Sequence, residues 1–199
     1  MRTPILLTIL VFALSYVSVQ NGPVAHAQDR FSGRTITGTA YFFPGRRSLR
    51  STSVPFTLII NRLSSPGEIN QLNSALQSGG QDELLRVLSR MEAGRIQIGT
   101  GVGVPANAIL ATQDGERTKL VVLYERNIRF AEMRYGLRSQ DYPFGYAELY
   151  IGSGANEGMI IPAAKVRLRG TDTWEVEDFG TFPGRLMGLQ VRGRGRIPR

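Results

Sequence analysis

The feature that most constrains the fold is the regular succession of strand-like segments and turn signals after residue 108. β-Branched and apolar residues there alternate with polar ones, and short turn sequences interrupt them at Asp114-Gly115, Asn156-Glu157-Gly158, Gly170-Thr171-Asp172 and Pro183-Gly184. Closely spaced strands with short connections are typical of antiparallel sheets. The pattern predicts an α+β fold, mainly antiparallel β, with about 8–10 strands in a barrel or a sandwich.

One hairpin is specified down to its register. Apolar and charged residues alternate strictly in 165–169 (KVRLR) and 173–177 (TWEVE), on either side of a short loop. The predicted opposite pairs are Leu168–Trp174 and Val166–Val176 on one face, and Arg167–Glu175 and Lys165–Glu177 on the other. A slip of one residue would bury all four charges at a cost of several kcal/mol. We therefore predict that Trp174 is buried and that the two glutamates form structural ion pairs rather than an acid/base pair.

The first half of the chain combines strands with a helical segment. The β-branched and apolar segments 33–43, 54–62 and 95–98 are predicted to be strands. Ser65-Pro66-Gly67-Glu68 has the pattern of a capping box with proline at the first helical position. Leucines at helical spacing follow on both sides of Gly79-Gly80. The sequence thus predicts a pair of short amphipathic helices near residues 65–92, packed on the sheet.

The N-terminal segment is predicted to be an export signal. Arg2 precedes an apolar run over residues 5–19, and Ala25 and Ala27 form the small-x-small pattern of a cleavage site. The run is shorter than the roughly 20 residues of a membrane span. We expect cleavage after Ala27 and a periplasmic or extracellular protein. The expected organisation is a signal peptide over 1–27, one β-rich domain over 28–191 and a flexible basic tail over 192–199.

After residue 27 the chain has neither cysteine nor histidine. Its stability must therefore come from a hydrophobic core without disulfides. The composition also excludes Ser-His-Asp and Cys-His nucleophiles and the conventional zinc and copper sites. The glycine-rich segment 99–103 lacks the third glycine of a dinucleotide-binding loop, and Pro105 follows it. We expect no metal or other cofactor.

The formal net charge of +8 is concentrated at the C-terminus. The tail carries four closely spaced arginines: Arg192, Arg194, Arg196 and Arg199. Guanidinium groups at this density attract anionic surfaces, and outside the cytoplasm these are head groups or envelope polymers rather than nucleic acid. The sequence predicts a weak anionic-surface contact, with an inert solvated terminus as the alternative.

The segment Phe130–Tyr150 combines aromatic rings with guanidinium and carboxylate groups. Such groups can bind a sugar, a peptide or an anionic small molecule by stacking and bidentate hydrogen bonds. The candidate ligand-binding residues are Arg134, Tyr135, Arg138, Asp141, Tyr142 and Tyr146. The alternative is that the rings fill the core and the arginines are solvated.

Several segments resemble an uncharacterised family of exported bacterial proteins of unknown function. They are FTLIINRL, LQSGGQDELLRVL, LRSQDYPFGYAELYI, IIPAAKVRLRG and RLMGLQVRGRGR. The resemblance would extend over residues 33–196. It implies export and a shared fold, and it assigns no functional residue.

These observations favour a secreted or periplasmic, non-enzymatic binding or interaction module. Its partner would be a small molecule, a glycan or a protein of the cell envelope. One alternative is a cell-envelope hydrolase that uses paired carboxylates, and another is a structural component of the envelope or of a secretion system. Two carboxylates roughly 5–10 Å apart in a cleft would favour the hydrolase. A cavity or a flat aromatic patch would favour binding, and a large exposed apolar patch or an unpaired sheet edge would favour the structural role.

Overall fold

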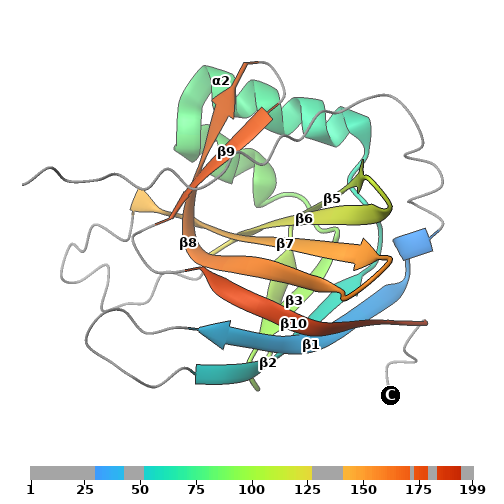
Figure 1. Cartoon of the computed structure of the whole chain (residues 1–199). Coiled ribbons are helices and arrows are strands. Elements are labelled where there is room, and N and C mark those ends of the chain that lie inside the picture. Colours follow the sequence, from blue (N-terminus) through green and yellow to red (C-terminus); the bar gives the residue numbers. More distant parts are fainter. Residues whose placement is uncertain (1–29, 43–51, 127–140, 171–172, 179–182, 194–199) are drawn as a thin grey trace, which may run out of the picture.

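The computed structural model describes residues 30–42, 52–126, 141–170, 173–178 and 183–193. Within these ranges the chain forms a ten-stranded antiparallel sheet and a helix, α2 (Figure 1). The elements are β1 (Arg34–Phe42), β2 (Thr52–Ile60), α2 (Pro66–Leu88), β3 (Gly94–Ile98), β4 (Val104–Ala106), β5 (Ala108–Asp114), β6 (Arg117–Glu125), β7 (Phe144–Gly152), β8 (Glu157–Arg169), β9 (Thr173–Asp178) and β10 (Gly184–Arg192). The predicted signal peptide and the tail beyond Gly193 lie outside the described residues.

All ten strands belong to one open sheet, in the order β4-β3-β2-β1-β10-β8-β7-β6-β5, with β9 paired to β8. The predicted mainly antiparallel α+β class and the number of strands are confirmed. The predicted closed barrel or two-sheet sandwich is not what forms. The sheet curls instead, so that β4 near one end packs against β6 near the other.

Two hydrophobic cores lie on opposite sides of this curled sheet. The first fills the inside of the curl with residues from both ends of the sheet, such as Ile36, Leu58 and Leu120. The second lies between α2 and the opposite side of β5–β9, where Leu72 and Trp174 are buried. Successive residues of β6 point alternately to the first and the second core. The strand is therefore apolar on both faces, and its sequence is a continuous hydrophobic run.

The predicted pair of helices is wrong, because the structure has the single helix α2 over this segment. Ser65 is its N-cap, and the predicted capping box with Glu68 is present. The backbone leaves helical geometry only at Gly80, where φ is 63°. Glycine takes this conformation without a steric penalty, so the element bends there instead of ending.

The predicted β8–β9 hairpin register is confirmed at all four pairs. Trp174 is buried, and its indole nitrogen donates a hydrogen bond to Asn73 Oδ1 on α2 (2.7 Å). The ion pairs on the other face run diagonally, from Arg167 to Glu177 (2.7 Å) and from Arg169 to Glu175 (3.3 Å). Long side chains reach diagonal neighbours on a sheet as readily as direct ones.

Among the described residues, no helix combines the length and apolarity that a membrane span requires.

Candidate functional site

The structure places the sequence-predicted site residues in different environments. Asp141 is exposed, whereas Tyr142 and Tyr146 are buried. Arg134, Tyr135 and Arg138 lie outside the described residues. The Tyr142 hydroxyl donates a hydrogen bond to Glu177 Oε1 (2.7 Å). Tyr142 and Tyr146 therefore do not meet in one site, because each ring is packed in the fold and each hydroxyl has a different glutamate partner.

Lys165 covers the Tyr142 ring. Its Nζ lies 4.6 Å from the ring centroid, the geometry of a cation–π contact. This explains why Lys165 does not form the ion pair with Glu177 that the sequence predicts. Tyr142, Lys165 and Glu177 thus form a packed, hydrogen-bonded part of the surface.

A cluster of polar side chains that the sequence did not predict surrounds the buried carboxylate of Glu148. Lys119 Nζ lies 2.8 Å from Glu148 Oε1, and the two side chains are 6% and 2% exposed. Tyr150 donates its hydroxyl to Glu148 Oε2 (3.0 Å), and Tyr146 donates to Oε1. The β6–β7 register sets Lys119 opposite Tyr150, so the lysine and the glutamate are diagonal neighbours on one face.

The electrostatics of this cluster keep both tyrosines protonated. Burial, followed by the negative charge of Glu148, raises the pKa of Tyr146 and of Tyr150 above the ordinary value of 10. The two hydroxyls therefore act as hydrogen-bond donors to an ionised carboxylate. A buried charge that is paired and hydrogen-bonded in this way fixes packing. The cluster serves as a structural node between β6 and β7.

Exposed polar, basic and apolar side chains gather on the half of the sheet formed by β1, β2, β3 and β10. Alternate residues of β3, β2, β1 and β10 point into the first core, and the residues between them form the opposite side of the sheet, which we call the outer face. Its residues are Arg95 and Gln97; Ser53, Pro55, Thr57 and Ile59; Thr35, Thr37, Thr39 and Tyr41; and Arg185, Met187, Gln190 and Arg192. Helix α2 lies at the far end of the sheet from β1, β2 and β10 (Figure 1).

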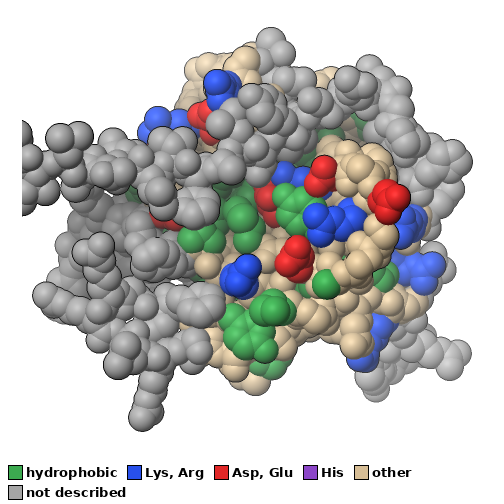
Figure 2. All heavy atoms as spheres, viewed as in Figure 1, with side chains coloured by type: hydrophobic (Ala, Val, Ile, Leu, Met, Phe, Trp, Pro, Cys, Tyr) green, Lys and Arg blue, Asp and Glu red, His purple; other side chains and the backbone are tan. Residues whose placement is uncertain are grey.

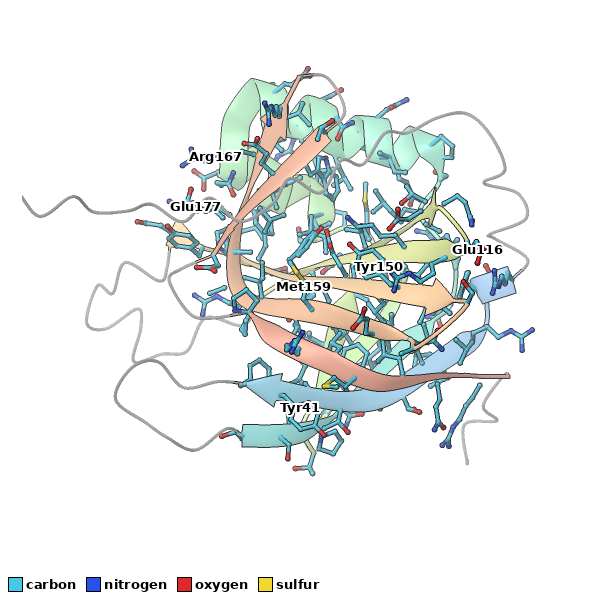
Figure 3. All side chains as sticks on the ribbon, in the orientation of Figure 1. Tyr41, Glu116, Tyr150, Met159, Arg167 and Glu177 are labelled. Atoms are coloured by element: carbon cyan, nitrogen blue, oxygen red, sulfur yellow. The ribbon has the colours of Figure 1, made fainter. Side chains whose placement is uncertain are left out.

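The strand register arranges the outer face in four rows that cross the strands. These are Arg95–Ile59–Thr35–Arg192, Gln97–Thr57–Thr37–Gln190, Pro55–Thr39–Met187 and Ser53–Tyr41–Arg185. The fourth row continues through Met159 on β8 to Glu148 on β7. Figure 3 shows Tyr41, Met159 and Tyr150 along this part of the sheet. Arginines thus stand in the first and last rows, and the two middle rows are uncharged.

The outer face carries no acidic residue. Strands β1, β2, β3, β4 and β10 contain neither aspartate nor glutamate. Among the described residues, the Arg95 guanidinium donates to the Gly103 carbonyl (3.3 Å) and the Arg192 guanidinium to the Gln190 side-chain oxygen (3.4 Å), both of them neutral acceptors. Within the described residues, no ion pair engages Arg185, Arg95 or Arg192. In Figure 2 the described acidic side chains lie over the upper part of the molecule, from β8 to α2, whereas β1 and β10 show basic, hydrophobic and uncharged groups.

The side chains of the outer face are accessible. Met187 is 50% and Ile59 is 38% exposed, Arg185 is exposed, and Tyr41 is partly exposed. An exposed surface with one aromatic ring, thioether and alkyl groups, hydroxyls, amides and guanidinium groups can contact a ligand by stacking and by hydrogen bonds. It is the arrangement in the described residues that best fits ligand binding.

Sequence reasoning missed this face because it combines the consecutive strands β1 and β2 with β3 and β10, which are distant from them along the chain. The available signal is compositional: threonine alternates with apolar residues in β1, and no acid occurs in any of the four strands. That signal shows which residues point outward in each strand. It does not show that the strands are neighbours or that no described helix packs on them.

Comparison with protein-family models, with curated proteins and with solved structures finds no match.

Proposed function

We propose that the protein is an exported, non-enzymatic binding module that holds an extended ligand on its outer face. The observation that carries the proposal is the register, which gathers Tyr41, Met187 and the arginines into rows on a side of the sheet that no described helix covers. Export is inferred from the predicted signal at the N-terminus.

The packing of the molecule favours this face over the inside of the curl. The first core is filled by buried aliphatic and aromatic side chains, such as Phe56, Leu149 and Leu186. A ligand is therefore expected on the surface. The rows are fixed by the backbone ladders of four strands, so little conformational entropy would be lost when a ligand binds across them.

The interactions would be of two kinds. The ring of Tyr41 and the thioether of Met187 offer apolar contact to one flat side of a ligand. The hydroxyls of Thr37 and Thr57 lie in one row with Gln97 and can donate to and accept from ligand hydroxyls. The Gln97 amide nitrogen donates to the carbonyls of Gly99 and Gly101, so its oxygen is the atom that can accept from a ligand.

The test blocks the centre of the outer face with a bulky side chain. Thr37→Trp would place an indole in the second row, and Gln113→Trp on exposed β5 is the matched control. Binding of the chain from Gln28 onward would be measured by calorimetry with cellohexaose and polygalacturonate, and by co-sedimentation with purified peptidoglycan. We expect at least one of the three to bind, with an association constant that falls at least about tenfold in Thr37→Trp alone.

Failure of all three probes to bind would overturn the proposal, and so would an equal loss of binding in Gln113→Trp. The bound glycans should also be recovered at their original length. Shortened chains would show that the protein is a hydrolase and would favour the paired-carboxylate alternative.

A further inference from the structure

We infer that the ligand of the outer face is an acidic polysaccharide; this inference rests on the proposed function. The outer face presents Arg95, Arg185 and Arg192 without an acidic residue among its other side chains. An uncompensated guanidinium on a flat surface attracts anions and can hold a carboxylate in a bidentate geometry. The ligand whose charge best complements the three arginines of this face is therefore one with several negative groups.

The spacing of the arginine rows favours a polymer. The first row crosses β1 at Thr35 and the fourth at Tyr41. At about 3.4 Å per residue, these two positions lie about 20 Å apart along the strand. A single small anion can reach one of these rows only. A ligand that engages both rows at once must be extended and must carry its charges at intervals.

The middle rows supply the contacts that a carbohydrate needs. They combine threonine hydroxyls and glutamine amides, which both donate and accept hydrogen bonds, with the apolar surface of Pro55 and Met187. Sugar rings have the same alternation of hydroxyl edges and apolar faces. The outer face thus matches a chain of sugar rings that carry carboxylates.

Other polyanions fit this face less well. A lipid surface would be held by protruding apolar groups beside basic ones, and the exposed large apolar residues of the outer face are Ile59 and Met187 only. A single-stranded nucleic acid would be bound by several stacked rings. Tyr41 is the one aromatic residue of the outer face.

The experiment compares two triple variants with the same loss of charge. Arg95→Gln, Arg185→Gln and Arg192→Gln together remove the arginines of the outer face. Arg86→Gln, Arg167→Gln and Arg169→Gln together remove three arginines that pair with glutamates elsewhere. Both variants keep Arg194, Arg196 and Arg199. Because Arg192 belongs both to the tail and to the outer face, the single variant Arg192→Gln is titrated beside them to measure its share. Each is titrated with polygalacturonate and with dextran of matched length, at roughly 50 and 150 mM salt.

We expect polygalacturonate to bind the unmodified protein more tightly than dextran does, and less tightly at the higher salt. Binding should fall at least about tenfold in the outer-face variant and less than about twofold in the control. Dextran that binds as tightly as polygalacturonate, with no effect of the outer-face substitutions, would overturn the inference and leave the proposed function intact. If neither glycan binds and cellohexaose and purified peptidoglycan also fail, both are overturned.

Two further probes distinguish other anions. Vesicles of phosphatidylglycerol and phosphatidylcholine, and a single strand of about 12 nucleotides, within the usual site size of single-strand-binding folds, are measured with the same proteins. One of these probes could bind more tightly than polygalacturonate and lose this binding in the outer-face variant. That result would overturn the inference of an acidic polysaccharide and would identify the class of that probe as the ligand. Equal melting temperatures of the unmodified protein and the outer-face variant would show that the arginines act on binding and not on folding.

Discussion

The two halves of the sheet treat charge in opposite ways. Strands β5–β9 contain both acids and bases, and several of their charged side chains form ion pairs within the molecule, as at Lys119–Glu148 and Arg167–Glu177. Strands β1, β2, β3, β4 and β10 contain arginines and no acid. One continuous sheet therefore has a half whose charges are neutralised internally and a half whose charges face outward.

The difference follows from what covers each half. Helix α2 packs on β6 and β8. On that side of the sheet Lys119 and Glu148 are buried and need each other as partners, whereas the ion pairs of the β8–β9 hairpin are exposed. No described helix packs on the outer face, where water solvates an unpaired guanidinium at little cost. The comparison shows where an unpaired charge can indicate a ligand site. It does so on a surface that no described helix covers, because a charge there is solvated and remains available to a ligand.

The largest expected effect is on the buried pair. Lys119→Met leaves the Glu148 carboxylate buried without a cation, and we expect the free energy of unfolding to fall by about 3–5 kcal/mol. Urea denaturation at pH 7 measures it. The double variant Lys119→Met with Glu148→Gln removes both charges and should recover most of the loss. A loss below about 1 kcal/mol in the single variant would show that the pair is solvated.

The next effect concerns the start of α2. Both guanidinium nitrogens of Arg62 bind the Glu68 carboxylate (2.7 Å each), and this contact, aided by the Ser65 cap, lowers the pKa of Glu68 from 4.5 to about 2. A lowered pKa stabilises the fold above the unfolded value, and this stabilisation is lost as the pH falls from about 4.5 towards 2. Glu68→Gln should cost about 1–2 kcal/mol at pH 7 because it weakens both the ion pair and the capping box.

Denaturation of the unmodified protein and of the Glu68→Gln variant across this pH range checks that the stabilisation is lost as the pH falls. The difference between them should be constant above about pH 5 and should shrink at lower pH. A difference that stays the same from pH 7 to pH 2 would contradict the role assigned to the Glu68 carboxylate.

A smaller effect is expected at the exposed ion pairs of the β8–β9 hairpin. Arg169 and Glu175 are 54% and 47% exposed, so water and salt screen their attraction. Glu175→Gln should change the free energy of unfolding by less than about 1 kcal/mol. Thermal melts at low and high salt measure this, and a loss as large as that of Lys119→Met would remove the distinction between buried and exposed pairs.

The smallest effect on stability is expected at the outer face. Arg185→Gln should change the free energy of unfolding by no more than about 0.5 kcal/mol, because the arginine has no ion-pair partner among the described residues to lose. Polygalacturonate binding should weaken nonetheless. A clear loss of stability would show that Arg185 supports the fold and would end the contrast between the two halves.

Much of the local structure could be predicted from the sequence. The strict alternation around Trp174 determined the β8–β9 register, since a slip would bury charges. Asp114-Gly115 determined the β5–β6 hairpin, and the Ser65–Glu68 pattern determined the start of α2. These features depend on neighbours in the chain, so the residues themselves carry the information.

The candidate site was harder to predict, because the same aromatic residues can fill a core or bind a ligand. Tyr142 and Tyr146 look like exposed binding residues in the sequence, yet both are buried with their hydroxyls bound to glutamates. Whether a ring is exposed depends on the layer packed above its strand, and a single segment does not contain that information.

The sequence by itself determined that the chain is a cysteine-free, mainly antiparallel β protein with a helix capped by Ser65. The structure decided that one helix, not two, extends over 66–88. Only the tertiary structure decided that β1 pairs with β10, which are about 150 residues apart in the chain and at opposite ends of it. That pairing brings Tyr41 beside Arg185 and forms the outer face. Contacts between these distant strands arise from burying one shared core, the first, to which both contribute, and the local pattern of any one strand is compatible with many partners.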